Sequence, residues 1–237
     1  MFTYLIFGLL VRLASAISLQ VASSGGNESS PLAYGLMFED INHSGDGGLY
    51  AELIQNRAFQ GSAVFPSTLD PWTPAGNATL TLQNSTTPLS SALPVSVQIT
   101  GTGIIGLVNP GWWGIDVQVQ TYTGSFWVLG AYSGNFTVKL QSNSTSNVFA
   151  KTTLASVSKS SEWTEHKFSL TPGTASPNSD NDFVIEFEAG ETALEFNLIS
   201  LFPPTYKNRK NGNRVELMEA LKALNPSFLR MPGGNNL

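Results

Sequence analysis

Two segments of the chain carry side chains that suit binding of a polar ligand. The apolar run 33–38 leads directly into Glu39, and the short run 227–230 ends in Arg230, with Asn235 shortly after it. Each run has the length and composition of a short strand buried on both faces, and the polar residues follow its carboxyl end. Carboxylate, guanidinium and amide groups at such strand ends suit hydrogen bonding to sugar hydroxyls. Two alternatives stay open from the residues alone: Glu39 can be a structural carboxylate that bonds loop amides, and Arg230 can be a salt-bridge residue.

Helical and extended patterns surround these two runs. A short strand is expected over 18–22, and a helix is expected over 48–59 with Asp46 as its N-cap. A second helix is predicted from Asn213, where Glu216 three residues later completes a capping-box pattern. Its apolar stripe consists of Leu217, Leu221 and Leu224, and Asn225-Pro226 ends it.

The region between the two expected helices has a different sequence pattern. Short runs of alternating apolar and polar residues recur between Gly, Pro, Asn and Ser, over 78–82, 95–99, 117–119, 136–140, 183–187 and 194–198. This alternation predicts an antiparallel β-sandwich with one face of each sheet buried, while 101–106 is expected to form a turn or bulge. Trp112 and Trp127 lie in this region, where they serve either as a sugar-stacking platform or as core residues.

The order of elements predicts the fold class. A strand and a helix precede the sandwich, and a helix and a strand follow it, so the protein is expected to be mainly β with an α/β start. The antiparallel, carbohydrate-binding-module-like sandwich would be inserted after the first βα unit of an incomplete (β/α)8 barrel, which takes about 250 residues when complete. The expected divisions are an N-terminal strand and βα unit over 17–60, the sandwich over 61–203, and the next helix and second barrel strand over 204–237.

Composition excludes several classes of function. The 237 residues carry a net charge of -5 with only 12 Lys plus Arg, so no concentrated basic face is available for nucleic acid. The chain has no cysteine and 2 histidines, which argues against a dedicated metal site, and no motif calls for a cofactor.

The N-terminus predicts export. Residues 1–16 have the apolar run and the Ala14-Ser15-Ala16 cleavage pattern of a signal peptide, and no other segment is apolar enough to span a membrane. A secreted, extracellular protein is therefore expected. The N-glycosylation candidates within its turn-rich, strand-bearing region are Asn77, Asn84, Asn135 and Asn143.

Beyond these patterns, the two polar segments resemble a known family. Residues 34–50 and 228–236, with Leu-Phe-Pro-Pro-Thr-Tyr-Lys at 201–207, look like the α-L-arabinofuranosidases of glycoside hydrolase family 51, in their fungal and plant branch. Within the sandwich, 109–114 and 122–127 also resemble the module inserted in those enzymes. The similarity extends from about Leu19 to the last residue, in the manner of an N-terminal fragment.

The resemblance implies release of terminal α-L-arabinofuranosyl residues from arabinoxylan, arabinan and related hemicelluloses by a retaining mechanism with two glutamates. Glu39 matches the family's substrate-binding glutamate, and Arg230 and Asn235 match its R-x-P-G-G-N motif. The family's acid/base follows an asparagine on a later strand. Here the only such pair, Asn27-Glu28, precedes the first expected barrel strand.

The chain is thus expected to lack both the acid/base and the nucleophile and to be inactive alone. Its expected partners are arabinose-containing polysaccharides or oligosaccharides. The alternative is a non-catalytic, secreted, carbohydrate-binding β-sandwich protein.

Overall fold

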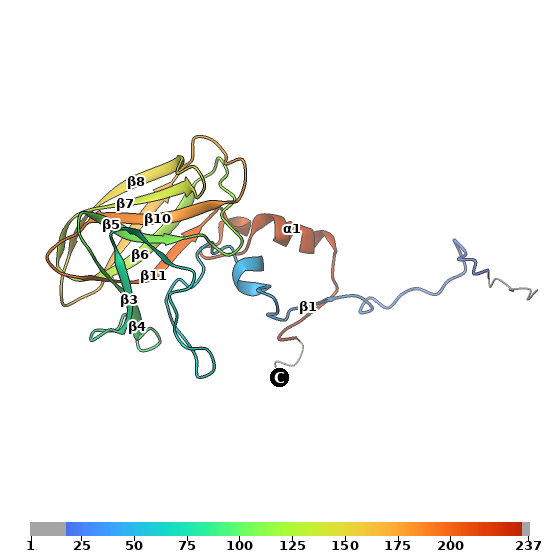
Figure 1. Ribbon diagram of the computed structural model, residues 1–237. Coiled ribbons are helices and arrows are strands. Elements are labelled where there is room, and N and C mark those ends of the chain that lie inside the picture. Colours follow the sequence, from blue (N-terminus) through green and yellow to red (C-terminus); the bar gives the residue numbers. More distant parts are fainter. Residues whose placement is uncertain (1–17, 234–237) are drawn as a thin grey trace, which may run out of the picture.

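The computed structural model describes residues 18–233, and two five-stranded antiparallel sheets make up most of it (Figure 1). The first sheet has the order β2 (Thr73–Gly76), β5 (Ile104–Asn109), β10 (Asn181–Glu188), β7 (Tyr132–Ser142) and β8 (Val148–Ser158). The second has the order β3 (Thr79–Asn84), β4 (Val95–Thr100), β11 (Leu194–Phe202), β6 (Tyr122–Leu129) and β9 (Thr164–Leu170).

The core lies between the two sheets, as the alternating pattern predicts. On β7, Phe136, Val138 and Leu140 are fully buried, and the residues between them are more exposed. Phe136 meets Phe126 of the opposite sheet edge-to-face, with ring centroids 5.3 Å apart. Such aromatic pairs add to the free energy gained by removing apolar surface from water.

The predicted sandwich is confirmed, with two local errors. The run 117–119 is not a strand, although Val117 is fully buried in its irregular segment. Residues 101–103 do turn, but β5 begins at Ile104 and includes Gly106. An added Cβ on Gly106 would lie 2.9 Å from the carbonyl carbon of Ile185, so this glycine permits close approach of two backbones.

A two-stranded parallel sheet flanks the sandwich. β1 (Leu36–Met37) pairs with β12 (Leu229–Arg230), and the sandwich is inserted between them in sequence, which confirms the predicted fold class. The expectation that both strands are buried is wrong, since Met37 is 53% exposed and Leu229 is 60% exposed. Within residues 18–233, each of these strands pairs with one neighbour only, and Leu36 is half-buried.

The helix predicted over 48–59 is also wrong. Only a five-residue π-type turn, η1 (Gly45–Leu49), forms there, and Gly47 at its centre has a φ of 86°. The following residues are extended, because the Leu53 amide donates to the Leu201 carbonyl at 2.9 Å. Ala51, Leu53 and Ile54 are buried against the sandwich, so tertiary contacts outweigh the helical spacing.

The second predicted helix exists with a different start. After the short η2 (Tyr206–Asn208), α1 spans Val215–Ala223 and has Arg214 at its N-cap position without a side-chain cap. The predicted capping box is therefore wrong, and the Asn213 side-chain amide instead donates to the Met218 sulfur at 3.4 Å.

The apolar stripe of α1 is largely uncovered, with Leu217 42% and Leu224 51% exposed. The strand expected over 18–22 is absent, and these residues are exposed in the segment that extends away from the sandwich (Figure 1). Within 18–233, no helix is long and apolar enough to cross a membrane.

Candidate sugar-binding site at the ends of the parallel strands

The parallel pairing brings the two chemistry-bearing segments to one edge. Met37 and Arg230 are register partners, and the Phe38 amide donates to the Arg230 carbonyl at 3.0 Å. The Gly233 amide donates back to the Phe38 carbonyl at 2.6 Å, which draws the segment after β12 towards the residue before Glu39. Because the strands are parallel, the segments beyond their carboxyl ends lie side by side.

Hydrogen bonds shape the loop that begins at Glu39. The Ser44 hydroxyl donates to the Glu39 carbonyl at 2.5 Å, and an Asp40 carboxylate oxygen accepts from the Gly45 amide at 3.0 Å. Asn42 and His43 adopt positive φ values of 51° and 61°, and this allows the chain to reverse within a few residues. The loop therefore uses Asp40 for its own backbone.

Glu39 and Arg230 remain available for a ligand. Glu39 is half-buried, and its carboxylate forms no hydrogen bond or ion pair with another described residue. Arg230 is exposed and directs one guanidinium nitrogen to the Met37 sulfur at 3.7 Å, a weak contact. Asn235 lies outside the described residues, as does the predicted signal peptide at 1–16.

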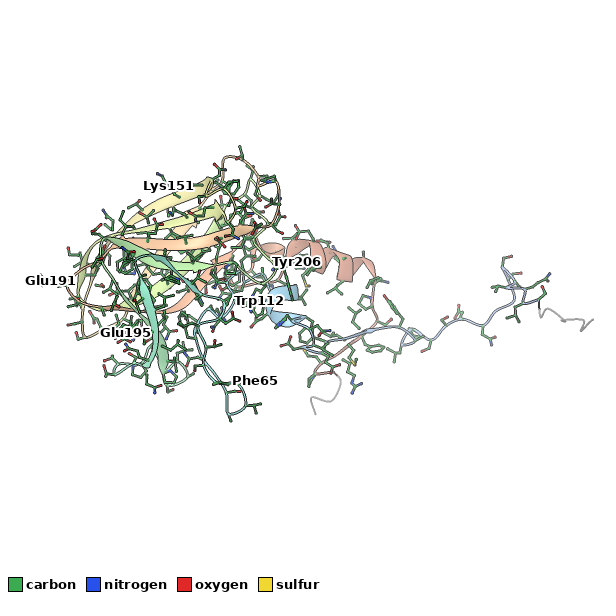
Figure 2. The ribbon with its side chains drawn as sticks, in the orientation of Figure 1. Phe65, Trp112, Lys151, Glu191, Glu195 and Tyr206 are labelled. Atoms are coloured by element: carbon green, nitrogen blue, oxygen red, sulfur yellow. The ribbon has the colours of Figure 1, made fainter. Side chains whose placement is uncertain are left out.

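Trp112 and Trp113 bring the sandwich into contact with the same loop. His43 lies 4.9 Å from Trp112 and 5.8 Å from Trp113, measured between ring centroids. The Trp113 indole N–H donates to the Gly47 carbonyl at 3.0 Å. Figure 2 shows Trp112 where the segment after β1 meets the sandwich. Trp112 is therefore a junction residue and has a buried indole N–H without a partner among the described residues.

Trp127 lies elsewhere, so the two predicted stacking residues do not form one platform. It is half-buried on β6 and lines a groove of about 890 Å³ on the second sheet, with Lys167 of β9 and Leu198 of β11. Trp112 does not line this groove. The two tryptophans therefore face different concavities.

The sequence patterns missed a buried carboxylate close to this junction. Glu52 is 2% exposed, and its Oε1 accepts from the Leu201 amide at 2.8 Å and from the Ile54 amide at 3.1 Å. Its Oε2 lies 3.4 Å from an Arg57 guanidinium nitrogen. Burial raises the pKa of Glu52, against the opposing effect of these partners. The sequence feature that could have indicated this buried carboxylate is a single acidic residue among the apolar residues of 51–54.

The glycosylation candidates all have exposed asparagines. Asn77 lies between β2 and β3, Asn84 ends β3, and Asn135 lies on β7. Asn143, beyond β7, donates through its side-chain amide to Asp180 at 3.0 Å. Within residues 18–233, no group of three or more His, Asp or Glu side chains is arranged to hold a metal ion.

Comparison with known proteins identifies close relatives, although no family model matches the chain. α-L-Arabinofuranosidase A of Aspergillus niger is 40% identical over 235 residues, which cover 96% of this chain and 37% of the relative. The probable α-L-arabinofuranosidase A of Aspergillus oryzae is 38% identical with the same coverage. The chain thus spans about a third of the length of the curated relatives that it matches.

A solved structure agrees with this similarity. An arabinose-bound α-L-arabinofuranosidase of glycoside hydrolase family 51 superposes with a TM-score of 0.80 at 41% identity. The superposition covers 87% of this chain and 35% of that one. Sequence and fold together therefore relate this chain, along nearly its whole length, to about a third of a family 51 α-L-arabinofuranosidase.

Proposed function

We propose that this chain supplies part of the arabinofuranose-binding pocket of a retaining α-L-arabinofuranosidase. The observation that supports the proposal is the register of β1 and β12, in which Arg230 is the last residue of β12 and pairs with Met37, two residues before Glu39. In this assignment, Glu39, Arg230 and Asn235 bind the hydroxyls of a terminal arabinofuranosyl residue. The segments 17–60 and 204–237 belong to a (β/α)8 barrel, and 61–203 is the sandwich inserted in it.

The chain alone is proposed to bind sugar without cleaving it. Retaining hydrolysis needs an acid/base and a nucleophilic carboxylate about 5 Å apart. The resemblance places both of these carboxylates on later barrel strands, and Asp40, next to Glu39, uses one oxygen to accept from the Gly45 amide. The purified chain should therefore release no nitrophenol from an aryl α-L-arabinofuranoside, and turnover by it would refute this assignment.

A chimera tests the pocket itself. This chain would replace the matched 37% of the Aspergillus niger enzyme, and arabinofuranoside hydrolysis would be measured before and after Glu39→Gln. The loss of charged hydrogen bonds to sugar hydroxyls should lower kcat/KM about 10- to 100-fold. Glu191→Gln is the matched control, because Glu191 is exposed in the β10–β11 loop at the far end of the sandwich (Figure 2). Equal activity of the two variants would contradict the proposal.

The alternative, a non-catalytic carbohydrate-binding sandwich, is favoured by the groove beside Trp127. A half-buried indole among polar side chains on an open sheet face suits stacking against a sugar ring. Affinity electrophoresis of this chain on arabinoxylan gels, with and without Trp127→Ala, tests it. Retention that depends on Trp127 supports the alternative, whereas retention unchanged by the substitution contradicts it.

Export is proposed as well, with 1–16 as the signal peptide and an extracellular location for the mature protein. The four asparagines named above are exposed, as glycan attachment requires. Expression in a fungal host, followed by N-terminal sequencing of the secreted product, tests the cleavage site. Retention of residues 1–16 on that product would contradict it.

A further inference from the structure

A second concavity lies where three parts of the chain meet. It has a volume of about 520 Å³ and lies between Gly47-Gly48 of η1, the segment 112–122 of the sandwich, and the first turn of α1. We call it the junction cleft. Its volume is within the range of about 300–1,000 Å³ that is usual for small-molecule sites. It adjoins the groove beside Trp127 at Pro203 and Pro204, but neither Trp127 nor any residue of β9 lines it.

The junction cleft is at the same end of the parallel sheet as Glu39. The loop after β1 reaches it through Gly47 and Gly48, only eight residues beyond Glu39. α1 precedes β12 in sequence, so its start lies towards the end at which β12 finishes, as in other α/β units. Arg214 fixes this arrangement, because its Nε donates to the Gly48 carbonyl at 2.8 Å and its amide donates to the Leu49 carbonyl at 2.9 Å.

Trp113 presents an aromatic surface in the cleft. It is 68% exposed, which is unusual for the largest apolar side chain. Its orientation is set by the hydrogen bond from its indole N–H to the Gly47 carbonyl and by the edge contact with His43. A ring held in this way loses little conformational entropy when a ligand stacks on it.

The remaining lining offers hydrogen-bonding groups and carries two carboxylates against one guanidinium. Asp116 and Gln118 bond to each other at 2.7 Å, and Gln120 bonds to the Tyr122 hydroxyl at 3.1 Å. Glu216 adds a second carboxylate, and the lining cation Arg214 is engaged with the Gly48 carbonyl. Planar amides and carboxylates beside an exposed indole suit the binding of a sugar ring. Because the lining has a net negative charge, it disfavours a sugar that carries a negative charge.

We propose that the junction cleft binds a neutral pentose oligosaccharide, namely the main chain to which a terminal arabinofuranosyl residue is attached. This inference rests on the proposed function, because it places the branch at Glu39 and Arg230 and the main chain along Trp113. Two oligosaccharides have this neutral pentose chemistry: a β-1,4-linked xylose chain and an α-1,5-linked arabinose chain. In this proposal, the inserted sandwich helps to determine which polysaccharide main chain the protein binds.

Titration calorimetry on the 237-residue chain tests this inference. Xylohexaose and linear arabinohexaose are the two ligands, and an oligogalacturonate of similar length is the anionic comparison. At least one of the two neutral oligosaccharides should bind, and the oligogalacturonate should not. Trp113→Ala should weaken the binding of the neutral oligosaccharide about tenfold, because the substitution removes the ring on which the sugar stacks. Trp163→Ala is the matched control, because Trp163 bonds to the Thr87 carbonyl and does not line the cleft.

A second variant and a comparison with Trp127→Ala complete the test. Should Trp113→Ala unfold, Asp116→Asn provides a second measure, since Asp116 is exposed and several-fold weaker binding is expected. Absence of binding by both neutral chains, or binding unaffected by both substitutions, overturns the inference. Loss of binding in Trp127→Ala alone also overturns it, because the groove on the second sheet would then be the site.

A ligand pair separates this inference from the proposed function. Each neutral chain is compared with the same chain carrying one α-L-arabinofuranosyl branch. If the arabinofuranose pocket is wrong, the branch adds no affinity while the dependence on Trp113 persists. If the junction cleft is wrong, the branch adds affinity that Trp113→Ala leaves unchanged.

Discussion

Glu52 provides a sharp test of how the segment after β1 is attached to the sandwich. Its Oε1 accepts from both the Leu201 and Ile54 amides, whereas its Oε2 lies near Arg57. Glu52→Ala would leave two buried amides without an acceptor, each costing about 1–3 kcal/mol. The free energy of unfolding should therefore fall by about 2–6 kcal/mol in total.

Glu52→Gln should behave differently although it also removes the charge. A glutamine oxygen in place of Oε1 can keep both amide hydrogen bonds, whereas the ion pair with Arg57 is lost. Arg57 is 36% exposed, so that pair is worth at most about 1 kcal/mol. Urea unfolding followed by tryptophan fluorescence at neutral pH measures both variants, with the slope of the transition checked for constancy.

The two variants also differ in pH dependence. Burial raises the folded-state pKa of Glu52 above its ordinary value of 4.5, so the folded protein holds this proton more tightly than the unfolded chain does. The associated stability is fully present below pH 4.5 and is lost as pH rises through the folded pKa. Glu52→Gln should remove this dependence. A loss below about 1 kcal/mol in Glu52→Ala, or equal losses in both variants, would refute the reasoning.

Three further predictions concern other parts of the chain. Gly47→Ala should lower the free energy of unfolding by about 1–3 kcal/mol, because φ is 86° and the new Cβ would lie 2.7 Å from the Trp112 ring. Gly103→Ala is the control: it has open space around it and should lower the same quantity by only about 1 kcal/mol. Chemical denaturation measures both variants. Burial lowers the pKa of His166 from 6.5, so its contribution to stability is present above pH 6.5 and is lost as pH falls; melting curves should show a decline on acidification that is flatter in His166→Asn. Asn135→Gln should remove one mobility step on endoglycosidase treatment of fungus-secreted protein, and an unchanged ladder would show that this exposed asparagine carries no glycan.

The sequence alone determined the sandwich and the candidate pocket residues, because both depend on local patterns. Period-two alternation in runs such as 136–140 reports directly on a half-buried strand, and the structure places these residues in the core. Glu39 and Arg230 were identifiable because each follows an apolar run of strand length. Their adjacency is a consequence of parallel pairing across nearly the entire chain, which the order of elements indicated.

Tertiary structure decided what local patterns could not express. The segment 48–59 has helical spacing, yet 51–54 lies extended and 55–58 turns, because the amides of Ala51 and Leu53 bond to Gly212 and Leu201, which are distant in sequence. The same long-range bonds bury Glu52, whose role no periodicity reveals. Trp112 and Trp113 reach the loop after β1 only because the sandwich folds back onto it. Which partner satisfies a backbone amide, and which face an indole meets, are properties of the packed chain.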